Sequence, residues 1–404
     1  MEGRLLLKDC TLLDGGQLRS HQAVVVEGPL VSRVAPDASE PVRPGDWAID
    51  ARGRLLLPGR IDAHALVPGL GDGRRAPTPA EVEALSLGAI AAALRAGLTC
   101  AMAQLPSGGD AAANLAAQAR AARRLGFRLL SSVAGEGVHA VATHDVNLAG
   151  AAATREDPLV RHGLGFADAL SASDELLRVV GRDSQRLRVP VQFRLAESDS
   201  QLADHFELHH RRIVERLDRH GLLGPSTIAA HARAVEGAEA ALLASRSVVI
   251  AWSPLADLLG ELHGFASVWL PEHRVALASG GAGGLAAQWT AARTLAHRAA
   301  RLGRLWAEER LLELLRGIGA AELLGQLFGH PVAEIAPGAL ADLVVLDQVP
   351  GEGASLESAL HRSVEAPVSW TVVHGRVVVR EGQLLGADLV ELLAEAAAAR
   401  RALA

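Results

Sequence analysis

Polar side chains suited to acid–base or metal chemistry stand at the ends of short apolar runs in this 404-residue chain. His64 closes a run that begins at residue 55, Glu197 closes a second run and His231 a third. Carboxylates and imidazoles are the groups that proteins most often use to transfer protons. Residues two apart on a strand point to the same side, so His64 shares its side with Leu66, whose aliphatic group cannot bind zinc. The sequence therefore predicts a polar site in which histidine and carboxylate side chains lie beside an aliphatic one.

Eight short apolar runs, each followed by a helical segment rich in Ala, Leu and Arg, provide the elements that position these residues. The runs are residues 55–64, 98–105, 128–135, 163–171, 189–197, 227–233, 248–254 and 274–281. This alternation is typical of βα units, and eight of them form a (β/α)8 barrel with its active site at the C-terminal ends of the strands. We also expect residues 132–160 to form a long loop over that mouth.

Both ends of the chain alternate β-rich runs with Gly, Pro and Asp turns, as in a small antiparallel sheet. The sequence therefore predicts an α/β protein with two domains. Residues 1–57 and 338–404 would form a composite β-sandwich domain, and residues 58–337 would form a TIM barrel.

The run that contains Pro58, Gly59, Ile61, Asp62 and His64 resembles the Pro-Gly-x-Ile-Asp-x-His-x-His strand of the amidohydrolase superfamily. Further stretches are similar to its cytosine deaminase and chlorohydrolase branch, most of all to SsnA-type aminohydrolases; they are residues 163–177, 193–198, 211–231, 253–260 and 337–347. The resemblance covers nearly the whole chain and implies a TIM barrel that hydrolyses non-peptide C–N bonds. Because one fold hosts many chemistries, the site must decide the function.

The resemblance also implies a divalent metal held by two histidines of the first strand, a histidine of the fifth and an aspartate after the eighth. Only His64 occupies its family position as a ligand. The other three positions hold Leu66, Arg194 and Gly280. The acid–base pair implied by the resemblance is retained, with Glu197 as the general acid/base and His231 as the histidine that steadies the attacking water.

These replacements predict weak metal binding. A complete four-ligand zinc site is worth about 10–16 kcal/mol, and most of this free energy disappears with three ligands. A fixed positive charge on Arg194 about 4 Å from the ion costs about 8 kcal/mol more at an effective dielectric of 20. We therefore predict no cofactor, with zinc or another divalent metal only if the family site is nevertheless occupied. Without a metal, the attacking water loses its usual activation.

Arg194 itself is predicted to replace the metal as the cation of the site. We expect its guanidinium to form a hydrogen bond with Glu197 within about 3.2 Å.

Two further elements are candidates for ligand binding. The loop after the last strand, formed by Ser279, Gly280 and Gly281, precedes a helix and would bind an anion with its backbone N–H groups. The alternative is that glycine simply relaxes a loop that has lost its aspartate. Trp252, at the end of the seventh barrel strand, would either fill the emptied pocket or stack on a substrate.

Three functions follow from this pattern. The first is a non-catalytic scaffold or regulatory subunit, with a protein partner or a second copy of the chain. The alternatives are an active or repurposed aminohydrolase of cyclic amidines or heterocycles, and a sensor of a small, anionic molecule.

Composition excludes several other classes. The net charge is −6, from 46 acidic and 40 basic residues, and no basic run suggests nucleic acid as a partner. Lys8 is the only lysine, so no barrel lysine is available for a Schiff base. Cys10 and Cys100 are too few for a disulfide framework, and neither a long apolar segment nor a signal-like start is found. We expect a cytoplasmic protein that does not contact membranes.

Overall fold

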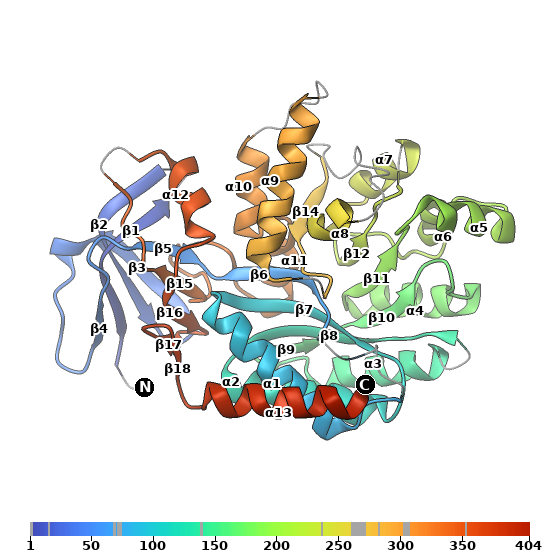
Figure 1. Ribbon diagram of the computed structural model, residues 1–404, viewed down its shortest axis with the longest axis horizontal. Coiled ribbons are helices and arrows are strands. Elements are labelled where there is room, and N and C mark those ends of the chain that lie inside the picture. The colour runs from blue at the N-terminus through green and yellow to red at the C-terminus, as the bar shows by residue number, and fades with distance from the viewer. Residues whose placement is uncertain are drawn as a thin grey trace.

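The computed structural model describes residues 3–404 apart from 15–16, 68–69, 71–74, 138–139, 236, 260–271, 282, 302–307 and 352–353. Within this part the chain folds into a barrel of parallel strands and a sheet built from both ends of the chain (Figure 1).

The sheet at the ends of the chain contains nine strands in the order β18-β17-β16-β15-β5-β1-β2-β3, with β4 paired to β1. Its strands are β1 (Leu5–Asp14), β2 (Gln17–Glu27), β3 (Leu30–Pro36), β4 (Trp47–Asp50), β5 (Leu55–Pro58), β15 (Leu343–Leu346), β16 (Val368–Val373), β17 (Arg376–Arg380) and β18 (Gln383–Leu384). The two halves meet where β5 pairs antiparallel with β15. Alternating buried Leu and Val side chains on these strands form its core, and the short helices η1 (Asp37–Ser39) and α12 (Leu356–Ser363) complete this region.

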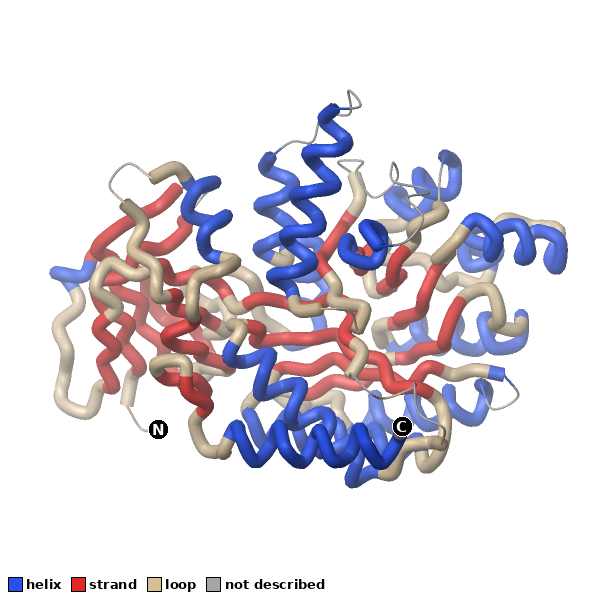
Figure 2. The backbone as a smooth tube through the Cα atoms, viewed as in Figure 1, coloured by secondary structure: helices blue, strands red, loops and turns tan. Residues whose placement is uncertain are grey.

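The barrel contains the eight strands expected from the sequence. They are β6 (Arg60–Ala65), β7 (Leu98–Pro106), β8 (Arg128–Ala134), β10 (Leu164–Asp168), β11 (Val191–Leu195), β12 (Thr227–His231), β13 (Val249–Trp252) and β14 (Arg274–Leu277), with β9 (Val160–His162) beside β8. They run as two parallel sheets, β6 to β9 and β10 to β14, which Figure 2 shows as two groups of red strands. Backbone hydrogen bonds from Gly163 to Ser131 and from Gly280 to His64 join the two groups at either side.

Helices cover the outside of the barrel. They are α1 (Pro79–Arg95), α2 (Ala111–Leu125), α3 (Ala140–Ala153), α4 (Asp174–Leu187), α5 (Asp199–His209), α6 (Ile213–Arg219), α7 (Gly237–Ser245), α8 (Pro254–Leu259), α9 (Leu285–Arg301), α10 (Glu308–Arg316) and α11 (Ile318–Phe328). Several begin at side-chain caps, such as Thr78 with Glu81 at the start of α1, which satisfy the first free N–H groups of the helix. The architecture predicted from the sequence, a TIM barrel with a β domain from both chain ends, is correct.

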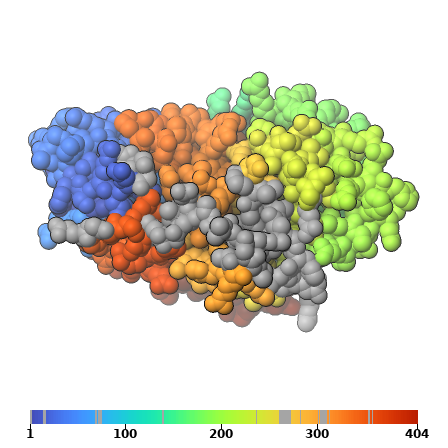
Figure 3. All heavy atoms as spheres, turned by 90° about the horizontal axis from the view of Figure 1, so that it is seen from above, coloured from blue at the N-terminus to red at the C-terminus, as the bar shows by residue number. Residues whose placement is uncertain are grey.

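Two details differ from the sequence-based expectation. Residues 132–160 are not one long loop, because α3 occupies most of them and packs against the barrel with buried His144 and Asn147. The final helix α13 (Leu389–Leu403) packs against α1 of the barrel, and Ala396 closely approaches Gly88 (Figure 1). Seen from above, the N-terminal strands and the barrel lie at opposite ends of an elongated molecule (Figure 3). In the described part of the chain, no helix is both long and apolar enough to span a bilayer.

Candidate functional site

The polar residues singled out in the sequence meet at the C-terminal ends of the barrel strands. His64 lies on β6, Arg194 on β11 and His231 at the last position of β12, while Glu197 follows β11 by two residues. Strands β11 and β12 are neighbours in parallel register, with Leu195 opposite His231. Strand pairing therefore brings the carboxylate and the imidazole to the same level of the barrel mouth.

Both strand ends turn sharply just beyond this level. Ala196, His231 and Ala232 have left-handed backbone conformations, with φ of 46°, 69° and 52°. Such conformations cost free energy for residues other than glycine, and they cluster at functional sites. Backbone bonds hold the bends in place, because Ala232 N–H donates to Leu195 O and Ala234 N–H donates to Ala196 O.

Glu197 lies between a cation and an imidazole. Its Oε2 is 3.5 Å from Nη1 of Arg194, and its Oε1 is 3.5 Å from Nε2 of His231. The Glu197 side chain is 28% exposed, so it is half-buried and partly accessible to solvent. The carboxylate therefore touches both protein and solvent, as a group that exchanges protons with a bound molecule must do.

Arg194 does not form the expected hydrogen bond with Glu197. Its Nε donates to Ala167 O at 3.1 Å, and its Nη2 lies 3.8 Å from Oδ2 of Asp168. The guanidinium lies between the carboxylates of Asp168 and Glu197, which explains why it forms a short hydrogen bond with neither of them. Asp168, at the end of β10, is a member of the site that we did not identify in the sequence, although its position at a strand end was a signal.

The two histidines of the site are buried and electrically neutral. Burial is the main cause that lowers the pKa of His64 to about 3, and His231 and Arg194 lower it further. Burial also lowers the pKa of His231, while the neighbouring Glu197 acts in the opposite direction. Their rings meet edge to face with centroids 5.8 Å apart. Neither ring nitrogen of His64 has a hydrogen-bond partner among the described residues.

Two of the three backbone N–H groups that were predicted to bind an anion in the glycine loop after β14 are already engaged within the barrel. The N–H of Ser279 donates to Oδ1 of buried Asp62, and the N–H of Gly280 donates to His64 O. These two amides close the barrel between β14 and β6, so they cannot also hold an anion. Burial raises the pKa of Asp62.

Glycine is needed in this loop because of its neighbours. Gly280 has φ of 57°, and a Cβ there would lie 2.7 Å from Oγ of Ser253. Gly281 has φ of 80° and covers Leu66, since a Cβ there would lie 3.3 Å from Leu66 Cβ. The aliphatic side chain and the loop thus fill the space together.

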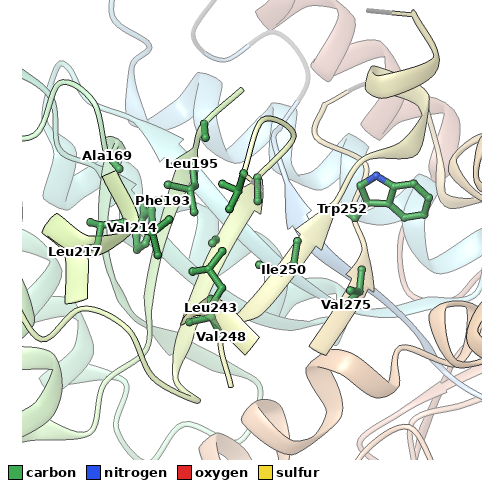
Figure 4. Close-up of a cluster of buried hydrophobic side chains, with 14 of the residues drawn as sticks. Ala169, Phe193, Leu195, Val214, Leu217, Leu243, Val248, Ile250, Trp252 and Val275 are labelled. Carbon is green, nitrogen blue, oxygen red and sulfur yellow. The ribbon is translucent and has the colours of Figure 1, made fainter. Parts of the chain in front are cut away.

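Trp252 is fully buried at the end of β13, beyond Ile250 of the same strand (Figure 4). Its Nε1 donates to Oδ2 of Asp257 at 2.7 Å, and the other carboxylate oxygen of Asp257 forms an ion pair with Arg233, 2.6 Å from its Nε. The indole therefore packs as part of the wall. Ser253 and Asp257, next to it, also belong to the site, although we did not single them out in the sequence.

Known relatives of this chain carry the names of deaminases. A 5'-deoxyadenosine deaminase of Methanopyrus kandleri is 28% identical over 247 residues, which cover 58% of this chain and 56% of that protein. The chain spans just over half the length of the relatives that it matches at this identity. A 5'-deoxyadenosine deaminase of Methanothermobacter thermautotrophicus is 25% identical over 427 residues and matches 98% of both chains.

Solved structures with the same fold include zinc-containing hydrolases. An adenosine deaminase from Xanthomonas campestris with bound zinc has a TM-score of 0.84 at 22% identity, covering 99% of this chain and 98% of that one. An atrazine chlorohydrolase from Arthrobacter aurescens in complex with zinc has a TM-score of 0.80 at 19% identity, covering 98% of this chain and 100% of that one. At these identities the likeness establishes the fold.

The expectation of a non-catalytic scaffold or regulatory subunit is wrong. Relatives that match almost end to end are named as deaminases, and the structural neighbours are deaminases and hydrolases. That expectation was based on the missing metal ligands. The names of the relatives support the alternative expectation, an aminohydrolase, better.

The residues of this site do not provide the ligands that a zinc ion like that of these neighbours would need. Across the described residues, no three His, Cys, Asp or Glu side chains come together in a way that could hold a metal ion. Zinc sites in proteins use at least three protein ligands. Leu66 and Gly280 offer no donor atom, and Arg194 carries a positive charge. The residues present therefore do not fit the zinc site that the family implies.

Family membership itself does not depend on that site. The model of the amidohydrolase family matches residues 55–378, which include every barrel strand and, from the composite sheet, strands β5, β15 and β16. This chain therefore belongs to the amidohydrolase family.

Proposed function

We propose that this protein is an aminohydrolase that releases ammonia from an amidine group, C(=N)–NH2, of a heterocyclic substrate. The names of the relatives favour adenosine-type nucleosides, in which the purine carries such a group. The observation that carries the proposal is the position of Glu197, 3.5 Å from both Arg194 and His231 at the barrel mouth.

The proposed reaction balances with water as the only co-substrate. The water oxygen bonds to the amidine carbon while Glu197 takes one water proton and passes it to the ring nitrogen. The remaining hydroxyl proton then moves to the exocyclic amine, the C–N bond breaks, and ammonia leaves behind a C=O group. Proton transfer by a placed carboxylate contributes about 10² to 10⁴ in rate.

His231 and His64 supply the surroundings for this water. Both rings are buried and neutral, so each offers one N–H donor and one lone pair. His231 also contacts the carboxylate that takes the proton. Burial lowers the pKa of both imidazoles and so weakens them as bases, which leaves them to orient the water while Glu197 takes its proton.

The test is an ammonia-release assay on the full chain. The panel contains 5'-deoxyadenosine, adenosine, adenine, cytosine and guanine, with the product confirmed by the change in ultraviolet absorbance. We expect turnover of at least one adenosine-type nucleoside, and a fall of at least about 100-fold in kcat/KM for Glu197→Gln. Glu207→Gln, on the exposed face of α5, serves as the matched control and should not change the rate. Equal activity of Glu197→Gln and the unmodified chain would contradict the proposal.

A further inference from the structure

We propose that Arg194 takes the place of a divalent metal as the cation of this catalytic centre, which therefore works without zinc. This inference rests on the proposed function and adds to it how the site stabilises negative charge. Solved structures with the same fold contain zinc, whereas the described residues of this chain include no group of three side chains that could hold a metal ion. The inference follows from this difference.

The barrel mouth does not leave the space that a metal and its ligands would need. The positions of two expected ligands are closed by packing, because the loop at Gly281 lies on the Leu66 side chain. An aspartate at position 280 would also have to displace Ser253, whose Oγ lies 2.7 Å from where its Cβ would stand. The loop after β14 would therefore have to rearrange before it could hold an aspartate at position 280.

The positive charge of Arg194 also opposes a divalent metal at this position. Arg194 extends from β11 beside the general-base candidate, with Nη1 3.5 Å from Glu197 and Nη2 3.8 Å from Asp168. A divalent ion near His64 and His231 would have to share this mouth with the guanidinium. Like charges at such separations repel strongly where water is partly excluded.

The guanidinium of Arg194 has donors to spare. Its Nε is anchored to Ala167 O, whereas Nη1 and Nη2 donate no hydrogen bond within the described residues. The side chain is 36% exposed, so a molecule bound at the barrel mouth can reach it. A fixed, permanently charged donor at that point stabilises the negative charge that develops on the attacking oxygen. The oxygen–carbon bond then forms as Glu197 takes the proton, with no metal-bound nucleophile required.

The first experiment measures metal directly. The full chain is purified without chelators, analysed for zinc, iron and manganese, and titrated with zinc in a calorimeter. We expect far less than one metal ion per chain, no saturable zinc binding at this site, and ammonia release that survives EDTA. Stoichiometric zinc whose removal abolishes activity, and whose return restores it, would overturn the role of Arg194 while leaving the proposed function intact.

The second experiment changes the charge. Arg194→Met should lower kcat/KM by about 100-fold or more, as removal of one charge-stabilising donor does in other enzymes. Arg194→Lys keeps the charge and should recover at least about tenfold over Arg194→Met. Arg178→Met, which removes an exposed arginine on α4, is the control and should behave like the unmodified chain. Full activity of Arg194→Met would overturn the inference.

A third variant keeps the inference testable if no substrate of the panel is turned over, in which case the proposed function fails by itself. Leu66→His, Arg194→His and Gly280→Asp are combined in a Ser253→Ala background, which removes the atom that the new carboxylate would meet. We expect this variant to bind about one zinc ion in the same titration while the unmodified chain binds none. Zinc binding by the unmodified chain that His64→Asn abolishes would overturn the inference.

Discussion

Nε2 of His231 lies 3.5 Å from Oε1 of Glu197, and the two residues come from adjacent barrel strands. Their separation is set by the pairing of β11 with β12, where Leu195 stands opposite His231. Backbone hydrogen bonds then fix the bends at Ala196 and Ala232. Because paired strands rather than a long loop hold these groups, the pair is organised before a substrate arrives.

Replacement of His231 should therefore affect catalysis more than folding. We expect His231→Asn to lower kcat/KM by about 10² to 10⁴ on any substrate that the protein hydrolyses. Asparagine tolerates the left-handed backbone at this position, so the fold should persist. The control is His210→Asn, also at a left-handed residue, on the exposed end of α5. Steady-state kinetics and circular dichroism separate the two effects, and an unchanged rate for His231→Asn would contradict the role.

The loop after β14 should not tolerate a side chain at position 280. A Cβ there would lie 2.7 Å from Ser253 Oγ at a φ of 57°, so we expect Gly280→Ala to lower the free energy of unfolding by about 1–3 kcal/mol. Ser253→Ala in the same chain should recover part of this loss, because it removes the atom in conflict. Urea unfolding of the two single variants and the double variant measures the coupling. If the two substitutions changed the free energy of unfolding by strictly additive amounts, Ser253 would not be the group that conflicts with a side chain at position 280.

The ion pair between Arg128 and Asp342 should be the most sensitive point between barrel and sheet. Arg128 on β8 donates from Nε and Nη2 to the two carboxylate oxygens at 2.6 and 3.0 Å, and both side chains are buried. Arg128→Met leaves a buried carboxylate without its cation, so we expect a loss of about 3–5 kcal/mol in the free energy of unfolding. Arg246→Met breaks an exposed pair with Asp218 and should cost less than about 1 kcal/mol.

A second variant identifies the cause of that loss. Asp342→Asn added to Arg128→Met removes the uncompensated charge and should restore part of the stability. If the double variant were less stable than Arg128→Met, lost packing against Phe328, rather than the buried charge, would explain the effect.

Buried His162 on β9 should make the protein less stable in mild acid. Burial lowers its pKa from 6.5 to about 4, so the unfolded chain binds a proton more readily than the folded one. The contribution of this residue to stability is complete above pH 6.5 and is lost as the pH falls from 6.5 towards 4. Between pH 7.5 and 5.5 this amounts to about 1 kcal/mol.

The measurement is urea unfolding of His162→Leu at both pH values. We expect the variant to lose about 1 kcal/mol less than the unmodified chain over this interval. His330→Leu, which replaces an exposed histidine, should lose as much as the unmodified chain. If all three proteins lost the same free energy of unfolding between the two pH values, protonation of His162 would not explain the loss of stability in acid.

The sequence predicted the barrel well because its strands are short apolar runs bounded by polar residues. All eight strands lie within or beside the expected segments, such as 227–233 for β12 and 248–254 for β13. Helix α3 escaped prediction because its glycine and alanine content gave no amphipathic stripe, and its buried His144 and Asn147 resemble loop residues in the sequence. The packing of α13 on α1 could not be predicted from the sequence either, since a contact between helices far apart in the chain leaves no local sequence pattern.

The sequence indicated several members of the site but missed Asp168, and it did not indicate the contacts between them. Strand ends correctly indicated that Glu197, His231 and His64 would share the mouth, because parallel strands finish at one edge of the barrel. Arg194 lies between Asp168 and Glu197, and its distances to the two carboxylates depend on how neighbouring strands pair. The spacing of these residues along the sequence does not indicate those distances. Likewise, only the closed barrel shows that the amides of Ser279 and Gly280 are already engaged.

The antiparallel pairing of β5 with β15 has a consequence for how this protein can form. Residues 55–58 and 343–346 flank the entire barrel, so the terminal sheet is completed only after everything between them has been synthesised. Pairing over such long sequence separations is slow, and incomplete strands expose unpaired edges meanwhile. Nascent chains interrupted before β15 should consequently depend on chaperones, even when all eight barrel strands have already emerged.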